Sequence, residues 1–275
     1  MIFKELTTKD LFIIDSKERG PNVCIIAGVH GNELPGIRAI TNLLLKNLKI
    51  KKGKVTFLFA NPAAIKKNVR FVEENLNRCF LKNKKRTNSY EERLSDDIKK
   101  ILNSYDICLD LHASNTPKSK PFIICEKNAN KVIDYLPVKL VCCGFDKIQP
   151  GGTDYYMNLI GKIGICLESG YINDKKSIVI CKKSILSVLS YFDLINYSIK
   201  KYSKVKLKAE YMYLAKTDFI LEKQFKDFEK INKDQLIGFD NNEKVFAKSK
   251  GRILFPRTIL KDSKSKEAFL FCKEL

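Results

Sequence analysis

The sequence VCIIAGVHGNE, residues 23–33, decides how the rest of the chain is read. It begins as an apolar run of strand length and turns at two glycines, and a helix-period pattern follows over residues 34–48. His30 and Glu33 therefore stand just past the carboxyl end of a predicted parallel strand. Ligands and catalytic groups collect at that edge of open α/β sheets.

The other histidine of the chain has the same setting. The 275 residues contain two histidines, and His112 ends a second apolar run, DICLDLH, at residues 106–112. Because the carboxyl ends of parallel strands share one edge, His30, Glu33 and His112 are expected to meet there. A catalytic zinc ion commonly takes three such protein ligands. The alternative is two unrelated histidines at the surface or in the core, and their shared strand-end setting favours the zinc site.

A glutamate ends a third apolar run. Glu168 directly follows the strand-like residues 163–167, and a buried carboxylate is costly unless it is paired or functional. Beside a metal-activated water it could accept a proton as general base; a strand-end salt bridge is the alternative. Asp110, on the same strand face as His112, is either a group that orients this ligand or an ordinary strand-end carboxylate.

Residues 61–90 have little periodicity and many polar groups. A long irregular segment inside a compact domain is usually functional or disordered. This one contains Arg70 and the pair Asn77-Arg78. Arginine binds carboxylates through two parallel hydrogen bonds and can polarise a carbonyl. Arg70, Asn77 and Arg78 are therefore candidates for binding an anionic substrate, with ordinary surface residues as the alternative.

The order of predicted elements indicates two domains. Up to residue 202, strands alternate with helices, which predicts an α/β fold with a mainly parallel sheet covered by helices on both faces. From residue 203 to 275, short period-two strand patterns are punctuated by glycine and asparagine, which predicts a small all-β module. We therefore expect a catalytic domain over 1–202 and a β domain over 203–275.

The net charge of +20 raises the question of nucleic-acid binding. The lysines are scattered along the chain, and eight of the 51 basic residues are arginine. A solvated, lysine-rich surface explains this pattern better than a nucleic-acid interface, although the charge favours an anionic substrate. No stretch approaches the ~20 apolar residues of a membrane span, so neither nucleic acid nor membrane is an expected partner.

The nine cysteines predict a reducing compartment rather than a disulfide framework. Several lie inside apolar strand-like runs, where a free cysteine behaves as a small hydrophobic residue. No Cys-x-x-Cys pair occurs. The first residues lack the basic and apolar regions of a secretory signal. A cytoplasmic protein is therefore expected, and the sequence leaves a monomer or a homodimer open.

These motifs together resemble the aspartoacylase / succinylglutamate desuccinylase family, a branch of the zinc carboxypeptidase fold. The resemblance covers residues from about 22 to 170, and residues 233–256 resemble the barrel-sandwich segment of the family's C-terminal module. The matching motifs occur in the family's order, as His30-Gly31-Asn32-Glu33, Asn61-Pro62, Arg70, Leu76-Asn77-Arg78, Asp110-Leu111-His112 and Glu168.

The resemblance implies a zinc-dependent amidohydrolase that removes the acyl group from a small anionic N-acyl amino acid. It implies one Zn²⁺ per chain with His30, Glu33 and His112 as ligands. Glu168 would be the general base and then the acid toward the leaving amine. Arg70 would polarise the scissile carbonyl, and Asn77 and Arg78 would hold a substrate carboxylate.

One position departs from the family pattern. Aspartoacylases carry a further arginine before the catalytic glutamate, which grips the second carboxylate of aspartate. Residues 154–161 contain no arginine; Asn158 stands about where it is expected, and Lys162 is a candidate substitute. N-acetylaspartate is therefore disfavoured as the substrate.

Two alternatives remain open from the sequence. A zinc carboxypeptidase acting on a peptide or cell-wall fragment would share the fold and the zinc site. A non-enzymatic binding or carrier protein is the other, because Lys244 in a predicted hairpin superficially resembles the modified lysine of a lipoyl-type module. Such hairpins are common turn chemistry, so the resemblance is weak.

Overall fold

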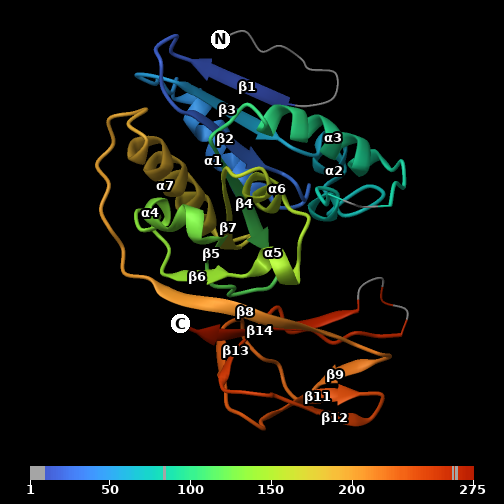
Figure 1. Ribbon diagram of the computed structural model, residues 1–275. Coiled ribbons are helices and arrows are strands. Elements are labelled where there is room, and N and C mark those ends of the chain that lie inside the picture. The colour runs from blue at the N-terminus through green and yellow to red at the C-terminus, as the bar shows by residue number, and fades with distance from the viewer. Residues whose placement is uncertain (1–9, 83–84, 262, 264–265) are drawn as a thin grey trace. The chain divides into compact units, whose positions relative to one another are not determined.

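The computed structural model describes residues 10–82, 85–261, 263 and 266–275. The described chain forms two compact units (Figure 1). The first contains the chain up to Lys139 together with Gln149–Lys204, and the second contains Leu140–Ile148 and Val205–Leu275. No helix among the described residues is long and apolar enough to cross a membrane.

The first unit is built on a mixed sheet with the strand order β1-β3-β2-β4-β7-β5. The four central strands β3, β2, β4 and β7 are parallel, while β1 and β5 pair antiparallel at the flanks. This confirms the predicted α/β class and mainly parallel sheet. The strands are β1 (Asp10–Asp15), β2 (Asn22–Ala27), β3 (Lys54–Phe59), β4 (Ile107–Ser114), β5 (Phe122–Cys125) and β7 (Ile163–Tyr171).

Helices cover both faces of this sheet (Figure 1). Helix α3 packs on the face formed by Cys24, Ile26 and Cys108, whereas α1 and α7 pack against each other on the opposite face. The other helices of the unit, apart from α1, α3 and α7, have seven residues or fewer. The helices are α1 (Leu34–Leu45), α2 (Pro62–Lys67), η1 (Leu76–Arg78), α3 (Tyr90–Leu102), η2 (Lys127–Ala129), α4 (Asn130–Ile133), α6 (Thr153–Leu159) and α7 (Lys175–Tyr191).

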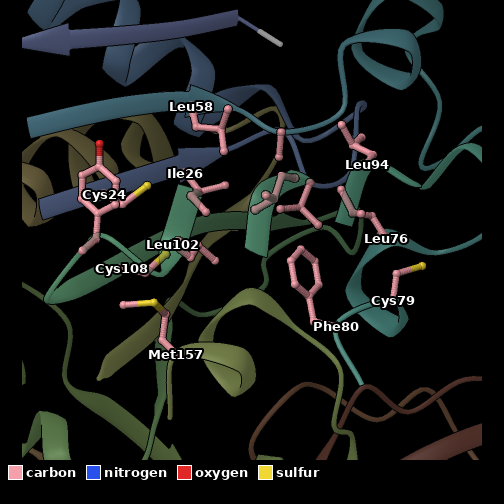
Figure 2. Close-up of a cluster of buried hydrophobic side chains, with 14 residues drawn as sticks. Cys24, Ile26, Leu58, Leu76, Cys79, Phe80, Leu94, Leu102, Cys108 and Met157 are labelled. Atoms are coloured by element: carbon pink, nitrogen blue, oxygen red, sulfur yellow. The ribbon is translucent and has the colours of Figure 1, made fainter. Parts of the chain in front are cut away.

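Figure 2 shows the apolar cluster between α3 and the sheet. Leu94 and Leu102 of α3 lie over the buried residues of β2, β3 and β4. Leu76 and Phe80, at the two ends of the short η1 region, belong to the same cluster and are fully buried. Burying a side chain of this size contributes about 1.5–3 kcal/mol. The polar residues of η1 are therefore held in place by apolar neighbours in the sequence.

Helix α1 lies unusually close to the sheet because Gly36 has no side chain. A Cβ atom built at Gly36 would lie 2.8 Å from the Cβ of Leu111 and 3.0 Å from that of Ala27. Pro35 occupies the first turn of the helix, where its missing N–H is not needed. The start of α1, and Glu33 before it, is thus packed directly against β2 and β4.

The second unit is mainly antiparallel β structure. One set of strands has the order β6-β8-β14-β13-β10, and a separate three-stranded sheet has the order β12-β11-β9. Aromatic rings fill its core; Tyr213 and Phe269, for example, stack with ring centroids 5.1 Å apart. The elements are β6 (Leu140–Cys143), α5 (Phe145–Ile148), β8 (Val205–Leu214), β9 (Phe219–Leu221), β10 (Glu229–Ile231), β11 (Leu236–Asp240), β12 (Glu243–Phe246), β13 (Gly251–Leu254) and β14 (Glu267–Glu274).

The segment 140–148 shows what a linear reading of domains misses. The sequence groups it with the first 202 residues, but β6 pairs in parallel with β8 and so belongs to the second unit. The predicted division of roles, with catalysis in 1–202 and a β module in 203–275, stays a prediction.

Some predicted element ends differ from the structure. Strand β4 continues to Ser114 and β7 to Tyr171, so His112 and Glu168 lie inside strands and not just after them. Strands β4 and β7 pair with each other as far as these ends, which extends both beyond their apolar runs. The irregular segment 61–90 contains the short helices α2 and η1, whose few residues carry no clear periodicity.

Candidate active site

The structure brings His30, Glu33 and His112 together in a buried cluster. Nδ1 of His30 lies 2.7 Å from Oε1 of Glu33, and Nδ1 of His112 lies 3.0 Å from Oε2 of the same carboxylate. The two imidazole rings are 5.0 Å apart. One carboxylate therefore stands between two imidazoles, one from the loop after β2 and one from β4.

The backbone holds Glu33 in this position from three sides. Glu33 is the residue before the first turn of α1, and its N–H donates to the carbonyl of His30 at 3.1 Å. Its Oε2 accepts from the N–H of Ala113 at 2.9 Å. A Cβ atom at Gly31 would lie 2.1 Å from the backbone of Ala64, so this position between the two ligands accepts only glycine.

An oxygen atom lies near the outer nitrogen of each histidine, and at His30 the two are hydrogen-bonded. Nε2 of His112 lies 3.1 Å from Oδ2 of Asp110, which also accepts from Oγ1 of Thr153 at 2.5 Å. Nε2 of His30 lies 3.0 Å from Oδ1 of Asn75. Such outer partners fix ring orientation and tautomer in metal sites. Asp110 thus lies beside His112, and its orienting role stays a prediction.

Burial and neighbouring charges act oppositely on the three groups. Burial raises the pKa of Glu33, but His30 and His112 outweigh this effect and hold the pKa well below its usual range. Burial lowers the pKa of His30, and nearby Arg70 lowers it further. Burial would also lower the pKa of His112, yet Asp110 and Glu33 raise it well above its usual value. An ionised carboxylate is therefore stable at the centre of the cluster.

The donor set fits a zinc ion. Both Nδ1 atoms and a carboxylate face one another, and the three ligand atoms lie within 4.8 Å of one another. Nε2 of His30 is hydrogen-bonded to Asn75 and Nε2 of His112 lies near Asp110, while the Nδ1 atoms of both rings face the Glu33 carboxylate and are available for coordination. Two imidazoles and a carboxylate are the ligand set of many catalytic zinc sites. This is the one such cluster found in the part of the chain that the structure describes.

Arg70 also reaches this cluster. Its Nη1 donates to Oε1 of Glu33 at 3.1 Å, and its side chain remains about half exposed. Its carbonyl accepts from the N–H of Gly31 at 3.3 Å, which ties the loop after α2 to the ligand loop. A guanidinium at this place can stabilise negative charge on a substrate oxygen.

Asn77 and Arg78 lie on η1, next to the glycine pair that precedes α6. Arg78 Nη1 donates to the carbonyl of Asn77 at 2.8 Å. A Cβ at Gly151 would lie 3.1 Å from Cα of Arg78, and one at Gly152 would lie 3.4 Å from Oδ1 of Asn77. That Oδ1 atom is buried without a hydrogen-bond partner. A ligand or a water molecule can satisfy a buried acceptor of this kind.

Glu168 lies directly opposite His112 in the register of β7 and β4. Neighbouring strands are about 4.8 Å apart and side chains alternate between faces, so Glu168 and His112 belong to the same side of the sheet. Glu168 is half-buried. A carboxylate on this side of the sheet is a candidate to exchange a proton with a water molecule at the cluster.

Neither candidate for the second carboxylate clamp lies near Glu168. Asn158 Oδ1 accepts from the N–H of Gly164 at 3.2 Å. Gly164 precedes Glu168 by four residues on β7, and four residues of a strand span about 13 Å. Lys162 Nζ lies 3.8 Å from Oδ1 of Asp106, just before β4 begins. Both side chains thus stand near the amino ends of the strands, at the opposite edge from Glu168.

Three residues of the site went unnoticed in the sequence. Asn75 caps η1 by accepting from the N–H of Asn77, Thr153 holds Asp110, and Glu91 accepts from the loop before η1. The asparagine before Leu-Asn-Arg is a capping residue in type, and this signal could have been used. Thr153 and Glu91 have no such local signal, because their partners are distant in sequence.

Fold and site together describe an α/β protein with a candidate metal centre at one edge of its parallel strands. The family model described as "Succinylglutamate desuccinylase/Aspartoacylase catalytic domain" matches residues 19–192, well over half of the chain. The chain belongs to this family, which confirms the family identified from its sequence motifs.

Individual relatives match over shorter segments. The chain is 44% identical over 69 residues to a succinylglutamate desuccinylase of Pseudomonas putida, covering 24% of this chain and 21% of the relative. It is 33% identical over 115 residues to an aspartoacylase of Xenopus tropicalis, covering 37% of this chain and 37% of the relative. The chain therefore matches well under half the length of these curated relatives.

Solved structures match over almost the whole chain. A succinylglutamate desuccinylase from Vibrio cholerae gives a TM-score of 0.78 at 18% identity, covering 96% of this chain and 85% of that one. A succinylglutamate desuccinylase/aspartoacylase from Rhodobacter sphaeroides gives 0.77 at 17% identity, with 96% and 88% covered. At this identity the likeness establishes the fold.

Proposed function

We propose that this protein is a zinc-dependent hydrolase that cleaves the amide bond of an N-acyl amino acid. The observation that carries the proposal is the buried cluster of His30, Glu33 and His112, with Glu168 opposite His112 on the adjacent strand. Membership of the succinylglutamate desuccinylase/aspartoacylase family supports the same chemistry. One ion per chain would be held by the two Nδ1 atoms and the Glu33 carboxylate.

A zinc ion held there supplies a Lewis acid and lowers the pKa of water toward ~7. Glu168 accepts a proton from the water that attacks the amide carbonyl, and then delivers a proton to the departing amine as the C–N bond breaks. Arg70 polarises the carbonyl oxygen, where negative charge develops during the attack. The products are a carboxylic acid and a free amino acid.

Asn77 and Arg78 form the proposed binding site for a substrate carboxylate. The guanidinium of Arg78 suits a planar carboxylate, and the amide of Asn77 offers an NH₂ donor group and a carbonyl acceptor. The unpaired Oδ1 of Asn77 would be satisfied by a substrate N–H. Because Asn158 and Lys162 stand at the far edge of the sheet, neither serves a second carboxylate. We therefore propose substrates other than N-acetylaspartate.

The test is a screen of N-acyl amino acids with zinc-loaded and chelator-treated protein. We expect release of the free amino acid only from the zinc-loaded sample. Peptides with a free carboxyl terminus belong in the same screen, because release of a C-terminal residue would identify a carboxypeptidase instead. Absence of turnover on every acyl amino acid would contradict the proposal.

Zinc binding is tested separately with His112→Ala. This variant removes one of three ligands, so its zinc content after dialysis should fall to a small fraction of the wild-type value. Asn158→Ala, at the opposite edge of the sheet, is the matched control and should keep full zinc content. Full retention of zinc by His112→Ala would refute the ligand assignment.

We also infer a reducing, cytoplasmic setting. All nine cysteines carry free thiols, and eight of them are buried. Burial raises the pKa of Cys181 to about 12, which makes that thiol a poor nucleophile. Such thiols suit a compartment in which disulfides are rare.

A further inference from the structure

A buried glutamate outside the metal cluster binds the loop that leads to it. Glu91, in the first turn of α3, is completely buried. Its carboxylate accepts from three consecutive backbone N–H groups, those of Val72 at 2.6 Å, Glu73 at 3.1 Å and Glu74 at 3.2 Å. A fourth hydrogen bond comes from Nδ2 of Asn61 at 3.1 Å.

The loop held by Glu91 lies between two residues of the site. Arg70 precedes it and contacts Glu33, and Asn75 follows it and contacts His30. Asn75 Oδ1 also accepts from the N–H of Asn77 at 3.0 Å, so this atom is fixed as an acceptor. Nε2 of His30 must therefore carry the hydrogen of the contact with Asn75, and Nδ1 is the nitrogen left for a metal.

The helix itself does not need Glu91 for capping. Ser89 caps α3 by accepting from the N–H of Glu92 at 3.0 Å. The carboxylate of Glu92 accepts from the N–H groups of Thr87 and Asn88, in the turn before the helix. Glu91 and Glu92 are thus neighbouring buried glutamates on one helix. Glu91 binds the site-bearing loop and Asn61, while Glu92 binds the preceding turn.

We propose that Glu91 is a positioning residue for the metal centre. Its carboxylate fixes residues 72–74 so that Asn75 holds Nε2 of His30 and presents Nδ1 to the ion. The inference rests on the zinc site of the proposed function, but not on the identity of any substrate. An isosteric Glu91→Gln change replaces one acceptor oxygen with an NH₂ donor facing N–H donors, which disrupts this loop at constant volume.

The experiment compares Glu91→Gln with Glu92→Gln in the full chain. Because the chain has two histidines, ¹⁵N-histidine NMR resolves His30 and His112 without crowding. Asn75→Ala provides the reference for a His30 ring that has lost its partner. We expect Glu91→Gln to shift the Nε2 signal of His30 as Asn75→Ala does, and Glu92→Gln to leave it unchanged.

Zinc affinity, measured by chelator competition, is the second measurement. Loss of an outer partner typically weakens metal binding about 10–100-fold, and we expect this in Glu91→Gln and Asn75→Ala. Glu92→Gln should lower thermal stability without changing zinc affinity. If Glu91→Gln fails to fold, Glu91→Asp carries the test, since it keeps the charge but draws the carboxylate away from the loop.

A wild-type His30 signal and wild-type zinc affinity in the Glu91 variant would overturn the proposal. Equal losses in Glu91→Gln and Glu92→Gln would also overturn it, because they would show a general effect on stability. Neither measurement uses a substrate. A failed substrate screen would therefore count against the deacylase proposal alone, and an unchanged His30 signal against Glu91 alone.

Discussion

At the scale of single residues, Glu33 is the group that joins the site together. Its two oxygens face His30 and His112, and Arg70 and the N–H of Ala113 bind the same oxygens. Four partners around one buried carboxylate keep it ionised, because each of them stabilises the charged form. A buried anion with two imidazoles is an arrangement that a divalent cation can complete.

The role of Glu168 is tested with Glu168→Gln. The change keeps the shape of the side chain and leaves the three zinc ligands intact, so zinc content and fold should be unchanged. Turnover should fall by at least the ~10²–10⁴-fold that general acid–base catalysis contributes. The control is Glu126→Gln, which should keep the wild-type turnover. Glu126 is half-buried and follows the end of β5, whereas Glu168 pairs with Phe122 at the start of that strand. Turnover is measured as kcat on any cleaved substrate. A near-native kcat in Glu168→Gln would refute the general-base role and favour a structural salt bridge for Glu168.

Arg70 and Arg78 should separate in their kinetics. Arg70→Ala should chiefly lower kcat, by about 10²–10³-fold, because a group that polarises the carbonyl acts on developing charge. Arg78→Ala should chiefly raise KM, by about tenfold or more, because a bound spectator carboxylate is held equally in ground and transition states. Steady-state kinetics on one substrate decides the matter; the reverse pattern would mean that the two roles are exchanged.

At the scale of elements, the start of α1 sets the position of Glu33. The helix reaches β2 and β4 closely because Gly36 lies against Leu111 and Ala27. The short η1 is placed in a comparable way, since Leu76 and Phe80 are buried in the apolar cluster (Figure 2). The functional side chains are therefore carried by rigid, packed turns, which suits a site that must hold fixed geometry.

Gly36→Ala tests this packing with two opposing effects. Helix propensity alone favours alanine by about 1 kcal/mol. The added Cβ would lie 2.8 Å from the Cβ of Leu111, so overpacking should cost about 1–3 kcal/mol and give a net loss of stability. Denaturant unfolding checks the sign, with Arg38→Ala on the exposed face of α1 as the control. A gain in stability would show that the sheet adapts without cost.

At the scale of the whole molecule, the chain folds as two units with separate cores. The first packs an apolar cluster between α3 and the mixed sheet, and the second buries a group of aromatic rings within its strands. The net charge of +20 is distributed over a lysine-rich chain, and one of its half-buried lysines is Lys204, which binds two backbone carbonyls. Its Nζ donates to the carbonyls of Leu136 and Val138 at 2.7 Å each.

Lys204 predicts a pH dependence of stability. Burial lowers its pKa from 10.5 to about 8. Between these values the unfolded chain binds more protons than the folded one, so the contribution of Lys204 to stability rises with pH across this window. Below pH 8 the group is charged in both states and its full desolvation cost is present.

The measurement is the free energy of unfolding of wild type and Lys204→Met between pH 8 and 10.5. The wild type should gain stability relative to the variant as the pH rises. Lys201→Met removes a lysine from the same segment and serves as the control. A constant difference between wild type and Lys204→Met would show that the buried lysine does not titrate in this range.

Much of the fold and of the site could be predicted from local patterns. The apolar runs at 23–29 and 106–111 predicted parallel strands because they are long enough and are followed by polar or glycine positions. The positions of His30 and His112 after these runs predicted one shared edge. Their convergence with Glu33 is seen in the structure, while the roles of Glu168, Arg70, Asn77 and Arg78 stay predictions.

The sequence by itself determined the α/β class, the family and the candidate ligands, because periodicity and motif order are local properties of the chain. Only the tertiary structure decided which groups surround those ligands. Asn75, Thr153 and Glu91 reach the site through partners about 20 to 45 residues away. The tertiary structure also assigns residues 140–148 to the second unit and places Asn158 at the edge of the sheet opposite Glu168. The physical reason is that strand pairing and long-range hydrogen bonds depend on chain topology, which local sequence does not encode.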